Sequence, residues 1–317
     1  MTSSNGAKPD VIVREVGLRD GLQLVKSFVP TETKLAWMRA VAAAGVPEIE
    51  TTNFVPAKVI AQFADATEVA KGALQIKGPL MCALAPNRRG GENGLAAGLK
   101  KMNFVLSVSE GHNLANVRKS TDASFAEFEN VVALKKERPE WRDVVIQGCL
   151  ATSFGCTIEG RVDPDRVLAF VDRYLELGAD EITLADTVGY AAPSEIANLF
   201  HHTVQLAAGK PVYAHFHDTR GLGLANVYAA LEAGVRGFDA STGGLGGCPF
   251  APGASGNIVM EDLVFLLEKE GLNTGVDLEK YRLARQIAEK TLPDENFYGT
   301  ILRAGLPKGF VPAAQAA

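Results

Sequence analysis

The sequence predicts a closed (β/α)8 TIM barrel of the α/β class, a single domain with a C-terminal helical extension. Short apolar runs rich in Val and Ile alternate with helix-like segments along the chain. Strict alternation of this kind implies parallel strands joined by right-handed crossovers. The chain has 317 residues, and eight strand–helix units near this length favour a closed barrel over an open, doubly wound sheet.

The expected elements can be placed in order along the chain. The eight strands are expected at 11–17, 47–53, 79–85, 102–109, 143–153, 180–189, 211–219 and 237–244. Helices are expected between them, for example over 31–45, 164–178 and 221–234. These three segments end on Gly45, Gly178 and Gly234, where a left-handed cap is expected. Asp163 precedes Pro164, and this pair is typical of a helix N-terminus.

The two ends of the chain differ from the strand–helix alternation. Residues 1–10 are polar and lack the features of a secretion or transit peptide, so we expect a disordered start. The barrel is expected to span 11–276. Residues 277–317 predict a helix and an irregular tail packed on the barrel, with a role that the sequence leaves open.

Composition excludes several classes of protein. The chain carries 32 basic and 37 acidic residues, a formal charge of −5, with Lys and Arg scattered along it. This balance argues against a nucleic-acid partner. No window approaches the ~18 continuous apolar residues of a membrane span, so no membrane partner is expected. The four cysteines form no CxxC pair, and this spacing indicates a reducing, cytoplasmic location.

Polar side chains follow most of the expected strands. The set comprises Arg19, Asp20, Glu50, Asn53, Asn87, Ser107, Ser109, Ser153, Asp186, Thr187, His215, His217, Asp218, Ser241 and Thr242. In a barrel these positions converge on the C-terminal mouth, where the loops build active sites. A purely structural barrel has no need of charge at the end of successive strands, so the pattern predicts an enzyme.

A histidine pair in the seventh strand predicts a metal site. His215 and His217 lie two residues apart, so both side chains point to the same face. The alternative is one histidine in the site and one packed in the core. Oxygen donors expected at the same mouth are Asp20, Glu50, Asp186, Asp218 and Asn257. Two nitrogens with several oxygens suit six-coordinate Mg²⁺ or Mn²⁺ better than tetrahedral zinc.

A glycine-rich loop follows the eighth strand. Residues 243–257 contain six glycines and two prolines. No Lys-Ser/Thr pair follows, so the loop is not a phosphate-binding Walker loop, and a plain hinge is the simplest interpretation. Cys248 lies within it, and a thiol in such a loop at an active-site mouth is a candidate acid or base. Cys82 and Cys149 instead lie in apolar runs and are expected to be small buried side chains.

Four segments together resemble the 3-hydroxy-3-methylglutaryl-CoA lyase family of barrel metallolyases. The likeness runs from about Val11 to about Asp277, and the glycine-rich loop is its most specific motif. The segments read VGLRDGLQ, ETTNFVPAK, HFHDTRGLGLANVYAALEAG and GGLGGCPFAPGASGNIVMEDLVFLLEKEG. Related synthases carry an acidic, arginine-containing loop in place of the Gly-Gly-Cys-Pro element, and they fit less well.

The resemblance implies roles for individual residues. It matches Asp20, His215, His217 and Asn257 to the ligands of a divalent metal, Mg²⁺ or Mn²⁺. It matches Arg19 to the arginine that stabilises the enolate-like anion, and Glu50 to the acid that supports it. It matches Cys248 to the cysteine that takes part in protonating the departing enolate. Asp20 and His215 are counted among the catalytic residues as well.

The implied reaction is a retro-aldol (Claisen-type) cleavage of an acyl-CoA substrate to acetyl-CoA and acetoacetate. A metal that holds the tertiary alcohol and the free carboxylate lowers the hydroxyl pKa. A fixed guanidinium suits the charge that grows on the thioester oxygen. A loop thiol can protonate the enolate while the closed loop excludes water. The resemblance also implies a homodimer.

Several positions depart from the family pattern, and they bear on the substrate. Leu18 and Asn53 replace the usual proline and serine, and segments 107–113 and 153–160 differ from the usual loops. These differences fall in loops expected to touch the acyl group or CoA. The alternative substrates are therefore citramalyl-CoA or a longer 3-substituted 3-hydroxyglutaryl-CoA. A non-catalytic barrel that binds an acyl-CoA or a protein is a further alternative.

Overall fold

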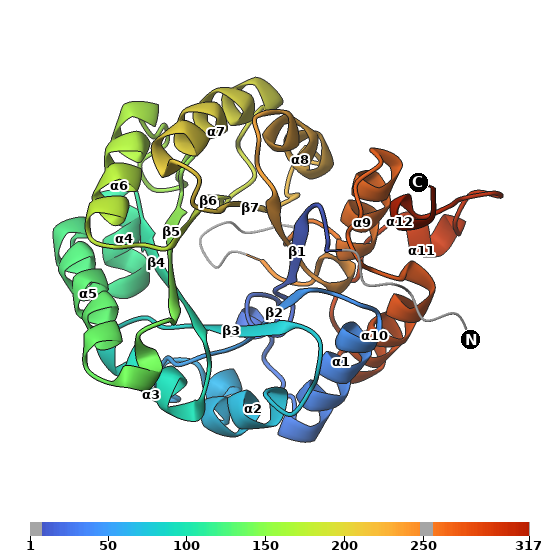
Figure 1. The fold of residues 1–317 in the computed structure, drawn as a ribbon, viewed down its shortest axis with the longest axis horizontal. Helices are drawn as coiled ribbons and strands as arrows, with labels where there is room; N and C mark the ends of the chain where they lie inside the picture. The colour runs from blue at the N-terminus through green and yellow to red at the C-terminus, as the bar shows by residue number, and fades with distance from the viewer. Residues whose placement is uncertain (1–7, 248–255, 317) are drawn as a thin grey trace.

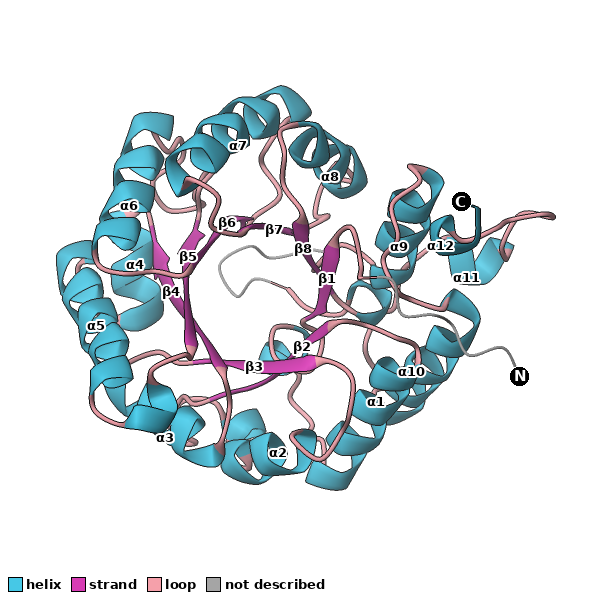
Figure 2. Cartoon of the chain, viewed as in Figure 1, coloured by secondary structure: helices cyan, strands magenta, loops and turns pink. Residues whose placement is uncertain are grey.

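The chain forms a closed barrel of eight parallel strands, each hydrogen-bonded to its neighbours in sequence order, with β8 closing onto β1 (Figure 2). The computed structural model describes residues 8–247 and 256–316. The predicted (β/α)8 class is confirmed. The strands are β1 (Ile12–Glu15), β2 (Glu48–Asn53), β3 (Leu80–Leu84), β4 (Lys101–Ser107), β5 (Val145–Ala151), β6 (Glu181–Asp186), β7 (Val212–Phe216) and β8 (Gly237–Ala240).

Helices surround the barrel as a ring (Figure 1). They are α1 (Thr31–Ala43), α2 (Ala66–Ala73), α3 (Arg88–Ala97), α4 (Glu110–Val117), α5 (Thr121–Ala133), α6 (Pro164–Glu176), α7 (Pro193–Ala207), α8 (Gly223–Glu232), α9 (Met260–Lys269), α10 (Leu278–Thr291), α11 (Ile301–Ala304) and α12 (Ala313–Ala316). Short 3-10 segments are η1 (Gly21–Leu24), η2 (Ala61–Phe63), η3 (Leu134–Lys136), η4 (Pro139–Trp141) and η5 (Thr242–Gly244). No helix in the described part of the chain is long and apolar enough to cross a membrane.

The expected helix ends are present. Gly45, Gly178 and Gly234 follow α1, α6 and α8 with φ of +91°, +98° and +100°. This left-handed backbone is the one that glycine adopts without steric cost. Asp163 caps α6 by accepting a hydrogen bond from the backbone N–H of Asp165. These caps set where each helix turns back toward the next strand.

The C-terminal helices lie together on one side of the barrel (Figure 1). Helix α10 packs against α1, with Tyr281 and Ala284 fully buried. Residues 1–7, most of the expected disordered start, lie outside the described residues. Asp10 exchanges backbone and side-chain hydrogen bonds with Asn273, which fastens the beginning of the described chain to the segment before α10.

The interior of the barrel is charged rather than apolar at its centre. Arg14 from β1 and Lys101 from β4 are both buried there, together with carboxylates from several strands. Lys101 forms ion pairs with Glu48 at 2.7 Å and with Glu181 at 2.5 Å. Buried charges persist only when they are paired and hydrogen-bonded. The barrel therefore holds a fixed polar network beneath its C-terminal mouth.

Candidate active site

Three potential metal ligands meet at the C-terminal mouth. One ligand atom from each of Asp20, His215 and His217 lies within 4.8 Å of the others. The Nε2 atoms of the two histidines are 3.2 Å apart, and the Nε2 of His217 is 3.6 Å from the Oδ2 of Asp20. All three side chains are at most slightly exposed. The alternative in which one histidine packs in the core is wrong.

Asn257 completes this group from the other end of the chain. Its amide Nδ2 donates to the Oδ2 of Asp20 at 2.8 Å and to the backbone carbonyl of Leu245 at 3.1 Å. The Oδ1 atom of Asn257 is buried and accepts no hydrogen bond from the described residues. Buried polar atoms are nearly always satisfied, so an unpaired oxygen beside a carboxylate and two imidazoles fits a cation ligand.

The charge balance at the centre of the barrel also fits a divalent cation. In the described chain, three cationic side chains interleave with five carboxylates there: Arg14, Arg19 and Lys101 against Asp20, Glu48, Glu50, Glu181 and Asp239. With both histidines neutral, this core carries an excess of two negative charges. A single divalent ion neutralises it, and mixed nitrogen and oxygen donors are ligands that Mg²⁺ and Mn²⁺ accept.

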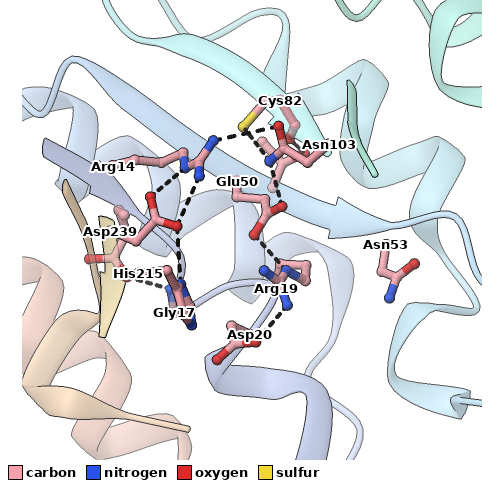
Figure 3. Close-up of polar contacts among 12 residues, drawn as sticks. Arg14, Gly17, Arg19, Asp20, Glu50, Asn53, Cys82, Asn103, His215 and Asp239 are labelled. Carbon is pink, nitrogen blue, oxygen red and sulfur yellow. Dashed lines mark hydrogen bonds and ion pairs between the residues drawn. The ribbon is translucent and has the colours of Figure 1, made fainter. Parts of the chain in front are cut away.

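Arg19 is held between two carboxylates (Figure 3). Its Nε donates to the Oε2 of Glu50 at 2.5 Å, and its Nη1 donates to the Oδ1 of Asp20 at 2.5 Å. Burial opposes the charge of the guanidinium, but the two carboxylates outweigh it and raise the pKa of Arg19 above its usual value. Its Nη2 donates to no other described residue, so a fixed donor remains for a ligand.

The same contacts keep Asp20 ionised. Burial alone would raise the pKa of Asp20, but the charge of Arg19 and the imidazoles of His217 and His215 together hold it well below the usual range. Glu50 is fixed from its other side, since its Oε1 accepts from the Nδ2 of Asn103 at 2.7 Å. The site is therefore preorganised around the charges of Arg19 and Asp20.

A third carboxylate, which the sequence analysis missed, orients His215. The Nδ1 of His215 lies 3.0 Å from the Oδ2 of Asp239 on β8, and Arg14 binds both oxygens of Asp239 at 2.8 Å (Figure 3). A carboxylate at Nδ1 fixes the proton there and leaves Nε2 as the donor atom. The register could have revealed the pair, because Asp239 and His215 are direct neighbours across β7 and β8.

A cavity of about 420 Å³ lies against these site residues. Its walls include Arg19, Asp20, Glu50, Asn53, Asn103, His112, Cys149, His215, His217 and Gly247. Two basic residues that follow α4, Arg118 and Lys119, also line it. Pockets of this size accept drug-sized ligands. The cavity can therefore hold an elongated, anionic organic molecule with one end at the metal-ligand group.

Most of the chain is similar to a family of known proteins. The HMGL-like family model matches residues 10–287. The chain belongs to the HMGL-like family. A hydroxymethylglutaryl-CoA lyase of Bacillus subtilis is 39% identical over 290 residues, 90% of this chain and 96% of the relative. The mitochondrial hydroxymethylglutaryl-CoA lyase of Rattus norvegicus is 39% identical over 283 residues, 88% of this chain and 85% of the relative.

A solved structure agrees with this assignment. An HMG-CoA lyase from Acinetobacter baumannii, in complex with coenzyme A and 3-methylmalate, superposes with a TM-score of 0.88 at 39% identity. The match covers 95% of this chain and 97% of that one. The recognition of the lyase family from the four sequence segments is thereby confirmed.

Two acids that were expected as oxygen donors at the mouth of this HMGL-like barrel instead accept hydrogen bonds from backbone N–H groups. Asp186 accepts hydrogen bonds from the backbone N–H groups of Tyr190 and Ala191, and Asp218 accepts one from Gly223. Each carboxylate fixes the loop that follows its own strand. Neither belongs to the group formed by Asp20 and the two histidines.

The loops that depart from the family pattern contribute unequally to the cavity. Asn53 and His112 line it, whereas no residue of 153–160 does. His112 is fixed by Ser107, whose Oγ lies 2.8 Å from its Nδ1, and burial lowers the pKa of the imidazole. The departure in segment 153–160 therefore does not reach the described cavity wall, contrary to expectation.

The cysteines are arranged differently from the expectation. Cys248 lies outside the described residues. Cys149 is partly exposed and lines the cavity, so the prediction that it is shielded is wrong. Alternating side chains of a barrel strand face inward, and position 149 points to the lumen. Cys156, in the loop after β5, is buried, and its Sγ accepts a hydrogen bond from the N–H of Ile158. Cys82 is buried as expected.

Proposed function

We propose that this protein is a divalent-metal-dependent carbon–carbon lyase that cleaves 3-hydroxy-3-methylglutaryl-CoA to acetyl-CoA and acetoacetate. The observation that carries the proposal is the meeting of Asp20, His215 and His217 beside Arg19 at the mouth of a barrel of this family. The family likeness supports an acyl-CoA substrate, and the basic residues that line the cavity support an anionic ligand.

We assign the metal-binding role to Asp20, His215, His217 and Asn257. When bound, Mg²⁺ or Mn²⁺ supplies Lewis acidity that lowers the pKa of the substrate hydroxyl and fixes the alcohol and carboxylate oxygens. The residues themselves are already oriented: Arg19 holds Asp20, Asp239 holds His215, and Leu245 holds the amide of Asn257.

We assign removal of the proton of the substrate hydroxyl to His215 or Asp20, the basic side chains among the proposed metal ligands. The Nδ1 of His215 faces Asp239, so His215 can take the proton only through an Nε2 that is not bound to the metal. The carboxylate of Asp20 keeps lone pairs while it binds a cation. The Nη2 of Arg19, which donates to no described residue, would neutralise the charge that develops on the thioester oxygen, while Glu50 fixes its guanidinium.

The last step of the reaction is protonation of the enolate of acetyl-CoA. We assign it to Cys248, on the basis of the family likeness and its position between Gly247, which lines the cavity, and Asn257. The thiol gives its proton to the enolate carbon and regains one from solvent before the next turnover. We further propose a homodimer, which light scattering measures directly, and a cytoplasmic location.

The experiment is a coupled assay of acetyl-CoA release with purified, metal-stripped protein. We expect release from 3-hydroxy-3-methylglutaryl-CoA only after Mg²⁺ or Mn²⁺ is added, with acetoacetate formed in equal amount. A panel with citramalyl-CoA and longer 3-substituted 3-hydroxyglutaryl-CoA thioesters identifies the preferred acyl group. Binding of CoA thioesters without cleavage of any of them would instead make the protein a non-catalytic binding barrel.

A further inference from the structure

The C-terminal helix α10 reaches the loops of the active site through buried polar side chains. Tyr281 and Arg285 lie one turn apart on α10, and both are buried. Their polar atoms meet two buried carboxylates, Glu15 at the end of β1 and Glu261 in the first turn of α9. A helix that only covered the barrel would bury apolar side chains here, so these polar contacts require another explanation.

Glu15 links the β1 loop to the β8 loop. Its Oε1 accepts from the N–H of Gly17 at 2.6 Å and from the N–H of Thr242 at 3.1 Å. Its Oε2 accepts from the hydroxyl of Thr242 at 3.0 Å and from the hydroxyl of Tyr281. Gly17 lies two residues before Arg19, and Thr242 begins η5, so one carboxylate fixes the roots of both loops.

Glu261 and Arg285 fix the next residue of the β8 loop. The Oε2 of Glu261 accepts from the N–H of Gly243 at 3.0 Å, while its Oε1 pairs with the Nη1 of Arg285 at 3.2 Å. The same Nη1 donates to the carbonyl of Tyr298, whose own N–H donates to the carbonyl of Gly243. The N–H of Gly243 is therefore held by α9, and its carbonyl is held by the segment after α10.

The backbone at position 243 requires glycine. Its φ is +61°, and a Cβ there would lie 2.3 Å from the Nη1 of Arg285. Two residues later, the carbonyl of Leu245 accepts from the Nδ2 of Asn257 at 3.1 Å. The fixed backbone of the loop thus orients the amide whose Oδ1 is left for the metal.

Glu15 and Glu261 accept all of these hydrogen bonds only when they are ionised, and contacts from α10 favour the ionised form. Burial raises the pKa of Glu15, and it raises the pKa of Glu261 to about 7 in spite of the charge of Arg285. A protonated carboxyl offers fewer acceptor sites than a carboxylate. The hydroxyl of Tyr281 and the guanidinium of Arg285 stabilise the ionised, accepting form of each group.

We propose that α10 positions the active site: Tyr281 and Arg285, acting through Glu15 and Glu261, fix the roots of the β1 and β8 loops and so set Asp20 and Asn257 for metal binding. This inference rests on the proposed function for the role of the two ligands. Tyr281 and Arg285 are positioning residues, since neither lines the cavity.

The test uses full-length Tyr281→Phe, Arg285→Met and Arg285→Lys variants. Tyr174→Phe is the matched control, because Tyr174 is equally buried but lies beside β5, where its hydroxyl meets the carbonyl of Cys149 at 3.4 Å. Mn²⁺ affinity is measured by titration calorimetry. We expect it to fall by about 10-fold for Tyr281→Phe and Arg285→Met, at the low end of the effect of residues that orient metal ligands. Arg285→Lys, which keeps the charge opposite Glu261, should retain most of the affinity.

Hydrogen exchange gives a second readout that needs no metal. In wild-type protein we expect slow exchange at Gly17, Thr242 and Gly243, and faster exchange at these amides in Tyr281→Phe and Arg285→Met. Exchange in β4 and β5 should not change. Unaltered exchange at the three amides, or equal losses of Mn²⁺ affinity in Tyr174→Phe, would overturn the proposal and leave α10 a covering helix.

The two proposals fail separately. If wild-type protein cleaves no CoA thioester, the proposed function fails, yet the exchange data and Mn²⁺ affinity still decide the role of α10. If the enzyme is active and the α10 variants keep wild-type exchange and affinity, only the positioning role fails. If Arg285→Met does not fold, Tyr281→Phe, which removes a single oxygen atom, carries the test with the same two readouts.

Discussion

The amide of Asn257 donates to the carboxylate of Asp20 at 2.8 Å, although the two residues lie near opposite ends of the chain. Asp20 follows β1, and Asn257 follows β8 and its glycine-rich loop. The two elements become neighbours only when β8 pairs with β1 and closes the barrel. Closure of the sheet therefore assembles the metal-ligand set, and stability of the β1–β8 seam is linked to metal binding.

Removal of a metal ligand should weaken metal binding. His217→Ala is expected to weaken Mn²⁺ or Mg²⁺ binding by ~10-fold or more, since even losses beyond the direct ligands reach that scale. His201→Ala, on the exposed face of α7, is the matched control and should bind normally. Calorimetry measures affinity, and excess chelator should stop thioester cleavage. Full activity of metal-stripped enzyme in chelator contradicts this prediction.

Asp239, the carboxylate that contacts the Nδ1 of His215, should affect metal affinity nearly as much as the ligands themselves. Asp239→Asn keeps the shape of the side chain but removes the charge that fixes the Nδ1 proton, so metal affinity should fall by about 10- to 100-fold. Glu181→Gln is the control, because Glu181 is a carboxylate of the same polar network that pairs with Lys101 and not with a histidine. Equal effects of the two variants would show that only the net charge of the barrel interior counts.

Arg19 is predicted to act on turnover rather than on binding. If its free Nη2 meets charge that appears only during cleavage, Arg19→Gln should lower kcat by about 10² to 10³. KM should change much less, because ground-state binding does not use that charge. Steady-state kinetics separate the two effects. A near-normal kcat with a raised KM would show that Arg19 only grips the substrate.

The barrel and the charged mouth were predictable because local patterns determine them. Alternating strand and helix segments specify the topology, and side chains at strand ends must gather at one face. His215 and His217 could be paired from spacing alone. Asp20 and Asn257 were expected among the oxygen donors at the mouth, but only the family likeness singled them out from Glu50, Asp186 and Asp218, because nothing local ties position 257 to position 20.

The residues that hold the site residues in place could not be predicted in the same way. Arg14 and Asp239 lie within short apolar strands, where a charge gives no sign of its partner until the register is known. The side-chain contacts of Tyr281 and Arg285 depend on how α10 packs against α1, α9 and η5. The exposure of Cys149 depends on which face of β5 points inward, and one residue of register reverses it.

Substrate selectivity is expected to depend on the cavity wall. Asn53 and His112 depart from the family pattern and line the cavity, so the preferred acyl group can differ from the 3-methyl compound. For the proposed substrate, kcat/KM measured on thioesters with progressively larger 3-substituents should be highest for the methyl compound. An optimum at a larger group, shifted back toward methyl by Asn53→Ser, would show that the cavity wall selects a different acyl group. A clear optimum at methyl in the wild type would make the departures neutral.

Alkylation of cysteine should inactivate the enzyme, with the modification at Cys248. A proton donor to the enolate must be accessible when the cavity is empty, and substrate should protect it. Cys149 is the competing target because it lines the cavity, but burial raises the pKa of its thiol to about 12. At pH 8 its reactive thiolate is therefore only about one part in 10⁴ of the total. Cys82 and Cys156 are buried and should not react.

Two variants separate these thiols. Cys248→Ala should keep metal and substrate binding yet lose turnover by ~10² or more, as for a lost general acid. Cys149→Ala should stay active and remain sensitive to iodoacetamide at pH 8, with the adduct mapped to Cys248 by mass spectrometry. In Cys248→Ala, modification of Cys149 should accelerate as the pH rises, because burial raises the pKa of its thiol and the thiolate is the nucleophile. Normal turnover by Cys248→Ala would make that thiol a bystander and leave water or a histidine as the proton source.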